Sequence, residues 1–343
     1  MRLALILASS LLAAADAGTA SSTSGPGTAP ATGKVLPSTR LKLPGPARIG
    51  MDYLAYDPQA DQVWVPASNA GTTVVIDAAT RKIRTVEGFL TVSKDNRTFG
   101  PTSVTIAEAF AYVGNRADNS ICPVEKKTLK LGSCVQLDST PDGVAYVATT
   151  QEVWITAPRD NSLRIVDARG ANLTAKGKMP LEGEPEGYAV DPRRGVFYTN
   201  LRDKDVTLAI DVRSHKVTAT YPLNCGKAGP RGLSIDLDKQ LLFVACTDHA
   251  ATLALRSGGK LVSQAPTGDG VDNPDYLPGR QLLYLAGGKT STLHVLRVSD
   301  DGGLTQIATA TTAAGGRVVV VDRRGTAFVA DSAGGQLVVV EPP

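Results

Sequence analysis

An aromatic residue followed by an aliphatic or β-branched residue recurs seven times along the 343-residue chain, at intervals of 41 to 48 residues. The seven pairs are Trp64-Val65, Tyr112-Val113, Trp154-Ile155, Tyr198-Thr199, Phe243-Val244, Tyr284-Leu285 and Phe328-Val329. Twelve positions after each aromatic stands an aliphatic residue, and a charged residue follows it, as in Ile76-Asp77 and Ile210-Asp211. A repeat of roughly 40–50 residues with four short strands is typical of a β-propeller blade.

The repeats predict an all-β fold, a seven-bladed β-propeller of four-stranded blades over residues 35–343. The chain has 34 Gly and 21 Pro, and no window has the apolar spacing of a long amphipathic helix. The last repeat ends after its third strand, near Glu341. We expect residues 35–48 to supply the missing outer strand, so that an N-terminal strand closes the ring and removes an exposed sheet edge.

Residues 1–17 have the pattern of a secretory signal peptide, with Arg2, an apolar run over 3–14 and the cleavage site Ala15-Asp16-Ala17. That run is too short to span a bilayer, and no other span is predicted. Residues 18–34 are rich in Gly, Ser, Thr, Ala and Pro, which indicates a flexible leader. We therefore expect an exported protein, periplasmic or extracellular, that is a monomer.

The formal net charge is +3, and no cluster of Lys and Arg accompanies it. A charge this small argues against nucleic acid as a partner. The expected partner is a small molecule, a glycan or a protein.

The repeats resemble those of the YncE-like, or YVTN-repeat, seven-bladed propellers. The segment "PEGYAVDPRRGVFYTN" followed by "TLAID" fits the blade pattern of that family closely, as does "AYVGN" at 111–115. The regularity is lost in the last three repeats, which read "FVACTDH", "YLAGGK" and "FVADSAG". The resemblance covers residues 35–343 and implies the fold rather than an activity, because this architecture has many functions.

A short turn of Pro and Gly recurs before each innermost strand, and the residue inside it varies in charge. The seven aligned positions are Asp52, Thr102, Asp142, Glu186, Arg231, Asp275 and Arg317. Because every innermost strand starts at the same end of the central channel, these side chains are predicted to form one ring at its mouth. The ring is either one asymmetric ligand site or a set of solvated charges that pair with each other.

The loop after each second strand is predicted to lie on the same face as this ring. It adds the candidate ligand-binding residues Asn115, Arg116, Arg159, Asn200, Arg202 and His249. The three arginines occur in successive blades, where they can hold a carboxylate, phosphate or sulfate group. The alternative is that they pair with the neighbouring Asp118, Asp160 and Asp203.

The four cysteines suit an oxidising compartment, and their places in the repeats predict the disulfides Cys122–Cys134 and Cys225–Cys246 among three possible connectivities. No C-x-x-C or His pair indicates zinc. His249, beside Asp248, is the one histidine in a position to act as a general base or ligand.

Two functions follow. The first is a binding protein whose top face takes a small anionic ligand, a glycan or a protein, with no cofactor required. The second is a lactone or ester hydrolase, or a lyase, with Ca²⁺ or Mg²⁺ held at the channel mouth by Asp52, Asp142, Glu186 and Asp275. No sequence motif demands catalysis, so binding is the preferred interpretation.

Overall fold

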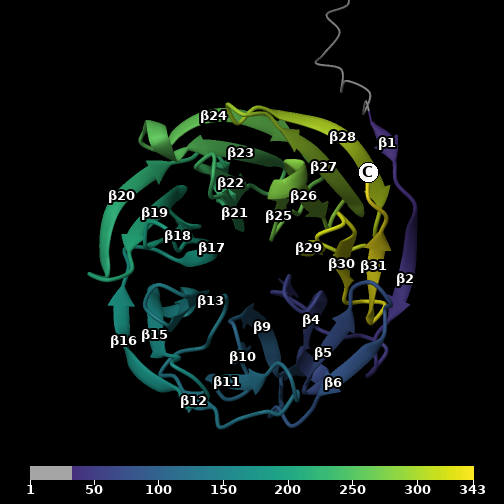
Figure 1. The fold of residues 1–343 in the computed structure, drawn as a ribbon, viewed down its shortest axis with the longest axis vertical. Helices are drawn as coiled ribbons and strands as arrows, with labels where there is room; N and C mark the ends of the chain where they lie inside the picture. Colours follow the sequence, from purple (N-terminus) through teal and green to yellow (C-terminus); the bar gives the residue numbers. More distant parts are fainter. Residues whose placement is uncertain (1–32) are drawn as a thin grey trace, which may run out of the picture. The chain divides into compact units, whose positions relative to one another are not determined.

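The computed structural model describes residues 33–343, which form one compact unit of seven blades around a central axis (Figure 1). The predicted all-β seven-bladed propeller is confirmed. The described part contains no α-helix, only five 3-10 turns, η1 to η5 (Ser68–Ala70, Pro158–Asp160, Gly226–Ala228, Leu255–Ser257, Pro278–Arg280). No described helix is long and apolar enough to cross a membrane. The predicted signal peptide and residues 18–32 of the predicted leader lie outside the described residues.

In blades 1 to 6 the four strands are antiparallel and follow chain order from the axis outward, whereas blade 7 has three such strands and takes its outermost strand from the N-terminal segment. The first four blades are β3–β6 (Ala55–Asp57, Gln62–Ala67, Thr72–Asp77, Ile83–Val86), β9–β12 (Pro101–Ile106, Phe110–Asn115, Ser120–Glu125, Val135–Gln136), β13–β16 (Val144–Val147, Glu152–Ala157, Ser162–Asp167, Thr174–Pro180) and β17–β20 (Pro185–Asp191, Val196–Leu201, Val206–Asp211, Lys216–Pro222). Blades 5 to 7 are β21–β24 (Leu233–Asp236, Leu241–Ala245, His249–Ala254, Lys260–Pro266), β25–β28 (Asp275–Leu277, Leu282–Gly287, Thr292–Val298, Leu304–Thr311) and β29–β31 (Val319–Val321, Ala327–Asp331, Gln336–Val340).

The N-terminal strand β2 (Ser38–Lys42) closes the ring, as predicted. It pairs antiparallel with β31, from Ser38 opposite Val340 to Lys42 opposite Gln336. A second short strand, β1 (Lys34–Val35), pairs in parallel with β28 of blade 6. The sequence did not predict this pairing, and it makes Lys34 part of a sheet rather than the end of a flexible leader.

The repeated aromatics form the packing between blades, since all seven are at most 4% exposed. Trp64 of blade 1 packs against Val104 and Val113 of blade 2, and Phe328 of blade 7 packs in the same way into blade 1. The repeat therefore exists because each blade covers one face with an aromatic from its neighbour.

The charged residue at the end of most third strands has a local role in the turn that follows. Asp77 Oδ1 accepts hydrogen bonds from the Ala79 and Thr80 backbone N–H groups, and Asp211 holds the corresponding turn in blade 4. Such side-chain acceptors favour tight turns after a strand.

Blade 5 departs from the predicted register. Phe243 lies opposite Thr252, whereas in blade 1 Trp64 lies opposite Val75, so the hairpin of blade 5 is shorter by two residues. Leu255 therefore falls in the turn η4, and Leu253 takes the buried third-strand position. The twelve-residue spacing from the aromatic to the aliphatic residue was therefore misleading in blade 5, because the hairpin loop is shorter and the turn η4 follows the third strand.

Both predicted disulfides are confirmed, with Cα–Cα distances of 4.1 Å for Cys122–Cys134 and 5.0 Å for Cys225–Cys246. The first joins β11 to the segment before β12 within one blade. The second joins the segment leading into blade 5 to the end of β22.

Candidate functional site

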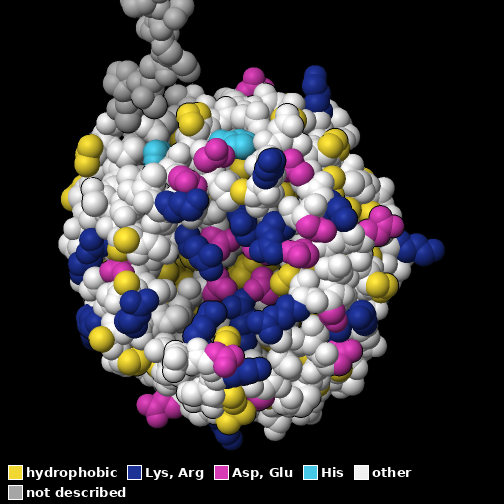
Figure 2. All heavy atoms as spheres, turned by 180° about the vertical axis from the view of Figure 1, so that it is seen from behind, with side chains coloured by type: hydrophobic (Ala, Val, Ile, Leu, Met, Phe, Trp, Pro, Cys, Tyr) yellow, Lys and Arg dark blue, Asp and Glu magenta, His cyan; other side chains and the backbone are white. Residues whose placement is uncertain are grey.

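One end of the central channel opens into a hollow of about 320 Å³, which we call the mouth. It is lined by Asp52, Tyr53, Arg116, Asp142, Pro158, Arg159, Glu184, Glu186, Arg202, Arg231, Asp272 and Arg317. Figure 2 shows Lys and Arg side chains gathered around a central hollow, with carboxylates between them. Five of the seven predicted ring residues and all three predicted loop arginines meet there.

The backbone explains why these side chains meet. The inner-strand starts of adjacent blades are hydrogen-bonded to one another: Gly187 N–H donates to Arg231 O at 3.2 Å, and Gly232 N–H donates to Asp272 O at 2.9 Å. A Cβ on Gly187 would meet the Gly232 Cα, so only glycine allows this approach. The residue before each glycine is then directed into the mouth.

Asp275, which the sequence placed in the ring, does not line the mouth. Asp272 takes that position in blade 6, because its carbonyl accepts the bond from Gly232 and its N–H donates to Arg317 O at 3.1 Å. Asp275 lies three residues further along the chain, at the start of β25 inside the channel. The predicted ring position of Asp275 was wrong because the sequence "NPD" resembles the Pro-containing turn of the other blades but does not form it.

Thr102 lies beside the mouth in a connected side groove of about 320 Å³, lined by Arg48, Ile49, Gly50, Met51, Asp52, Ser68, Asn69, Arg97, Thr98, Phe99, Thr102, Arg116, Arg317 and Ser332. One wall is the hairpin β7–β8 (Val92–Lys94, Arg97–Phe99), which the sequence analysis missed. Its signal was the Asp95-Asn96 dipeptide, and both residues have the positive φ of a tight hairpin turn.

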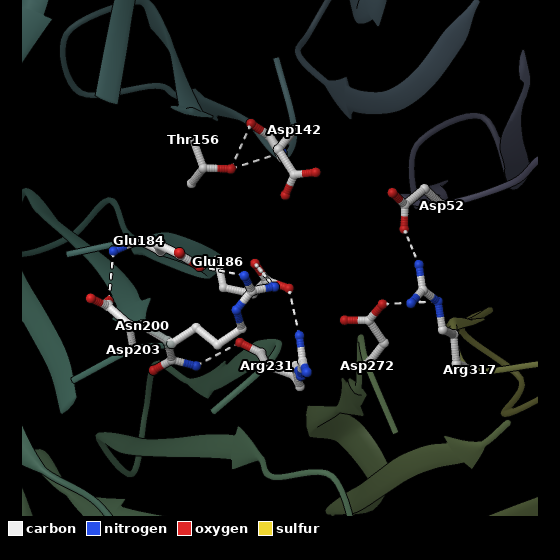
Figure 3. Close-up of polar contacts among 12 residues, drawn as sticks. Asp52, Asp142, Thr156, Glu184, Glu186, Asn200, Asp203, Arg231, Asp272 and Arg317 are labelled. Carbon is white, nitrogen blue, oxygen red and sulfur yellow. Dashed lines mark hydrogen bonds and ion pairs between the residues drawn. The ribbon is translucent and has the colours of Figure 1, made fainter. Parts of the chain in front are cut away.

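The two predicted asparagines have structural roles. Asn200 Nδ2 donates to Arg231 O at 2.6 Å, which secures the neighbouring inner strand (Figure 3). The Asn200 Oδ1 accepts a hydrogen bond from the Thr207 hydroxyl. Asn115 Nδ2 donates to Leu90 O at 3.0 Å. Both side chains are buried, so neither is presented to a ligand.

His249 lies at the start of β23, outside the residues that line the mouth. Its Nδ1 is 2.7 Å from Asp248 Oδ1 and its Nε2 is 3.1 Å from Gln264. Its ring also lies with the sulfurs of Cys225 and Cys246 within 4.8 Å, but these sulfurs are joined in a disulfide. The general-base role of His249 stays a prediction.

Ion pairs across blades link the charges of the mouth. Arg317 contacts Asp52 at 3.5 Å and Asp272 at 3.1 Å, as Figure 3 shows. Arg116 bridges Asp52, at 3.0 Å, and Asp142.

On the other side of the mouth, Arg231 contacts Glu186 at 3.2 Å, and Arg202 pairs with Glu184 and lies 3.7 Å from Glu186. The alternative in which the loop arginines pair with Asp118, Asp160 and Asp203 is therefore not what the structure shows. Arg159 is exposed and forms no ion pair with any residue of 33–343.

Two carboxyl groups of the mouth are harder to ionise than usual. Burial raises the pKa of Asp272 to about 7, with Arg317 opposing the shift and Asp52 adding to it. Burial likewise raises the pKa of Asp142 to about 6, against the effect of Arg116. Burial and the neighbouring Asp142 also keep Tyr53 protonated, since they raise its pKa well above its ordinary value, and its hydroxyl donates to Asp142 at 3.1 Å.

The four carboxylates predicted to hold a divalent ion are not gathered into one donor set. Asp52, Asp142 and Glu186 each contact an arginine, and Asp275 lies below them in the channel. Within residues 33–343, no group of three such oxygens comes as close together as the ligand atoms around His249. Arginines occupy the space that a cation cage needs, and Ca²⁺ or Mg²⁺ binding stays a prediction.

Comparison with known proteins identifies the class by fold. No family model matches the chain, and no curated protein matches it. Solved structures that resemble it include a hydrazine synthase of Kuenenia stuttgartiensis (15% identity, TM-score 0.71, covering 88% of this chain and 97% of that one). A chain of a mitotic checkpoint complex gives 14% identity and a TM-score of 0.74, covering 96% and 99%.

A catalytically inactive virginiamycin B lyase from Staphylococcus aureus, solved with quinupristin, gives 13% identity and a TM-score of 0.71, covering 90% and 100%. Identities this low show the fold alone. The chain is a seven-bladed β-propeller whose mouth is lined by arginines and carboxylates.

Proposed function

We propose that this propeller is an exported binding protein that holds a small anionic ligand at its mouth. The observation that carries the proposal is the balance of charge. The mouth and the side groove together present seven arginines, namely Arg48, Arg97, Arg116, Arg159, Arg202, Arg231 and Arg317. Against them stand five carboxyl groups, of Asp52, Asp142, Glu184, Glu186 and Asp272.

Two of those five carboxyl groups ionise only near neutral pH, so the positive excess is larger still in mildly acidic solution. Arg159, without an ion-pair partner in the described part of the chain, supplies free donors. Arg202 and Arg231 can share theirs with a ligand, because guanidinium groups bind carboxylate, sulfate and phosphate through several hydrogen bonds at once. Two disulfides and the signal-peptide pattern support export, and the quoted repeats support membership of the YncE-like propellers.

Removing one arginine tests the site. Arg231→Ala should weaken binding of sulfate about tenfold or more, given roughly 1.5–3 kcal/mol for a hydrogen bond to a charged group. Glu186→Gln should strengthen it, because the charge that competes for Arg231 and Arg202 is gone. Calorimetric titration with sulfate measures both effects.

Arg213→Ala is the matched control, since Arg213 is exposed in the β19–β20 turn and does not line the mouth. It should bind sulfate as the unaltered protein does. Equal binding by Arg231→Ala and the unaltered protein would mean that the mouth charges only solvate one another.

Sulfate affinity should also rise as the pH falls. Asp272 and Asp142 have folded-state pKa values of about 7 and about 6, above the ordinary 3.8. Because both pKa values are higher in the folded protein than in the unfolded chain, protonation of these two groups stabilises the folded state. This contribution to stability is complete below about pH 4 and is lost as the pH rises through 6 to 7. Over that same range the mouth gains negative charge.

We expect sulfate to bind roughly five- to tenfold more tightly at about pH 5.5 than at about pH 8, because the mouth then carries less negative charge. Sulfate does not titrate in this range, so the protein is the source of any change. Asp272→Asn should bind sulfate more tightly than the unaltered protein at about pH 8 and should keep only the part of the pH dependence that comes from Asp142. A flat pH profile in the unaltered protein would contradict the assignment.

A further inference from the structure

A second cavity, of about 440 Å³, lies in the central channel directly beneath the mouth, and we call it the channel cavity. Tyr53 lines both spaces. Asn273 and Val318 line the channel cavity one residue after Asp272 and Arg317 of the mouth. The two spaces are thus consecutive along the inner strands.

The walls of the channel cavity differ in chemistry from those of the mouth. Leu54, Leu233, Leu277 and the run 318–321 line it, and its ionisable groups are Asp275, Arg323 and tyrosines. A space of this size is ample for an apolar group, since roughly 150 Å³ of apolar cavity accommodates benzene.

Two stacked tyrosines form the wall of the channel cavity on the side of blades 2 and 3. The Tyr53 and Tyr188 rings stack with centroids 5.9 Å apart, and their hydroxyls bond to Asp142 and to Val144 O of blade 3. No residue of β9 or β13 lines the channel cavity. The channel cavity therefore lies along β3, β21, β25 and β29.

Apart from Asp275 and Arg323, the polar side chains that line the channel cavity are uncharged, namely its tyrosines, Ser234 and Asn273. Asp275 accepts the backbone N–H groups of Val321, at 2.7 Å, and Tyr276, at 2.8 Å, and burial raises its pKa to about 7. The buried Nδ2 of Asn273 has no hydrogen-bond partner in the described residues. An orphan buried donor favours a ligand that brings an acceptor to it.

We propose that the ligand of this protein is amphipathic: its anionic group lies among the arginines of the mouth, and an uncharged alkyl or aryl body enters the channel cavity past Tyr53. This inference rests on the proposed function, because the mouth must hold the anion. It deepens that function by naming the class of ligand, an organic sulfate, phosphate or carboxylate with an apolar body rather than a free inorganic ion.

A series of alkyl sulfates of constant charge tests the proposal by calorimetry on the full chain. Each methylene that leaves water should strengthen binding about fourfold, so hexyl sulfate, with its longer alkyl chain, should bind roughly 1000-fold more tightly than methyl sulfate if all the added methylenes are buried, and roughly 60-fold more tightly if three of them are. Ser234→Phe narrows the channel cavity, since Ser234 is half-buried in its wall. That variant should lose the gain with chain length and keep its affinity for inorganic sulfate.

Retained affinity for inorganic sulfate also shows that the Ser234→Phe variant has folded. If that variant does not fold, Ala55→Leu, on the cavity wall in blade 1, is the alternative variant for the same test. Equal affinity along the series, or a chain-length gain that survives the filled cavity, overturns the channel proposal. Inorganic sulfate that binds without such a gain refutes only the channel cavity as a ligand site. Failure of every sulfate to bind refutes the mouth itself.

Discussion

A chain that lacks residues 18–46 should unfold about 10 °C or more below the full chain, or fail to fold. The deletion removes β1 and β2 and leaves β31 as an open edge. It also removes Leu36 and Leu43, which are 3% and 2% exposed in the cores of blades 6 and 7. Two leucines alone account for roughly 3–6 kcal/mol of buried apolar surface, before the lost strand pairing is considered.

The matched control is a deletion of residues 18–32, which ends before the first described contacts. Gly33 lies against the Ile307 backbone and Lys34 pairs with Ala308, so this shorter deletion should leave the unfolding temperature unchanged. A deletion of 18–36 isolates the contribution of β1 and Leu36. Thermal unfolding followed by circular dichroism compares all three. An unchanged midpoint for the longest deletion would show that the ring does not need its closing strand.

Removing the Cys225–Cys246 disulfide by changing both residues to alanine should lower the free energy of unfolding by about 3 kcal/mol. The two cysteines are 21 residues apart, and a loop of that length restricts the unfolded chain by about this amount. Both are buried, at 6% and 0% exposed, so the bond is also part of the blade 4–5 core. Denaturant unfolding of the double variant measures the loss. A midpoint equal to that of the unaltered protein would place the stabilisation elsewhere.

Graded reduction separates this bond from the other one. Cys134 is exposed, whereas both sulfurs of the Cys225–Cys246 pair belong to buried residues. Mild reductant should therefore open Cys122–Cys134 first, because thiol–disulfide exchange needs access to a sulfur. Mass mapping of alkylated peptides gives the order, and the reverse order would contradict the burial argument.

In the regular blades, the structural position of a residue could be predicted from its place in the sequence repeat. The aromatic spacing predicted seven blades, and the truncated last repeat predicted that an N-terminal strand closes them. The turn positions of Glu186 and Arg231 led correctly to the mouth. Where a blade deviates, the same reasoning failed. In blade 6 it assigned the ring position to Asp275 instead of Asp272, because the sequence around Asp275 matches the turn pattern. In blade 5 it assigned the buried third-strand position to Leu255 instead of Leu253, because a shorter loop is followed by an extra turn.

The sequence by itself determined the period, the number of blades, the closing strand and the two disulfides. These depend on strand length and hydrophobic alternation, which are local and repeat along the chain. Only the tertiary structure decided that Arg116 pairs with Asp52 and Asp142, that Tyr53 stacks on Tyr188, and that an apolar cavity lies beneath the charged mouth. Those contacts join blades up to 135 residues apart in sequence (Tyr53 to Tyr188), and closure of the ring around the axis brings them together, so no local pattern specifies them.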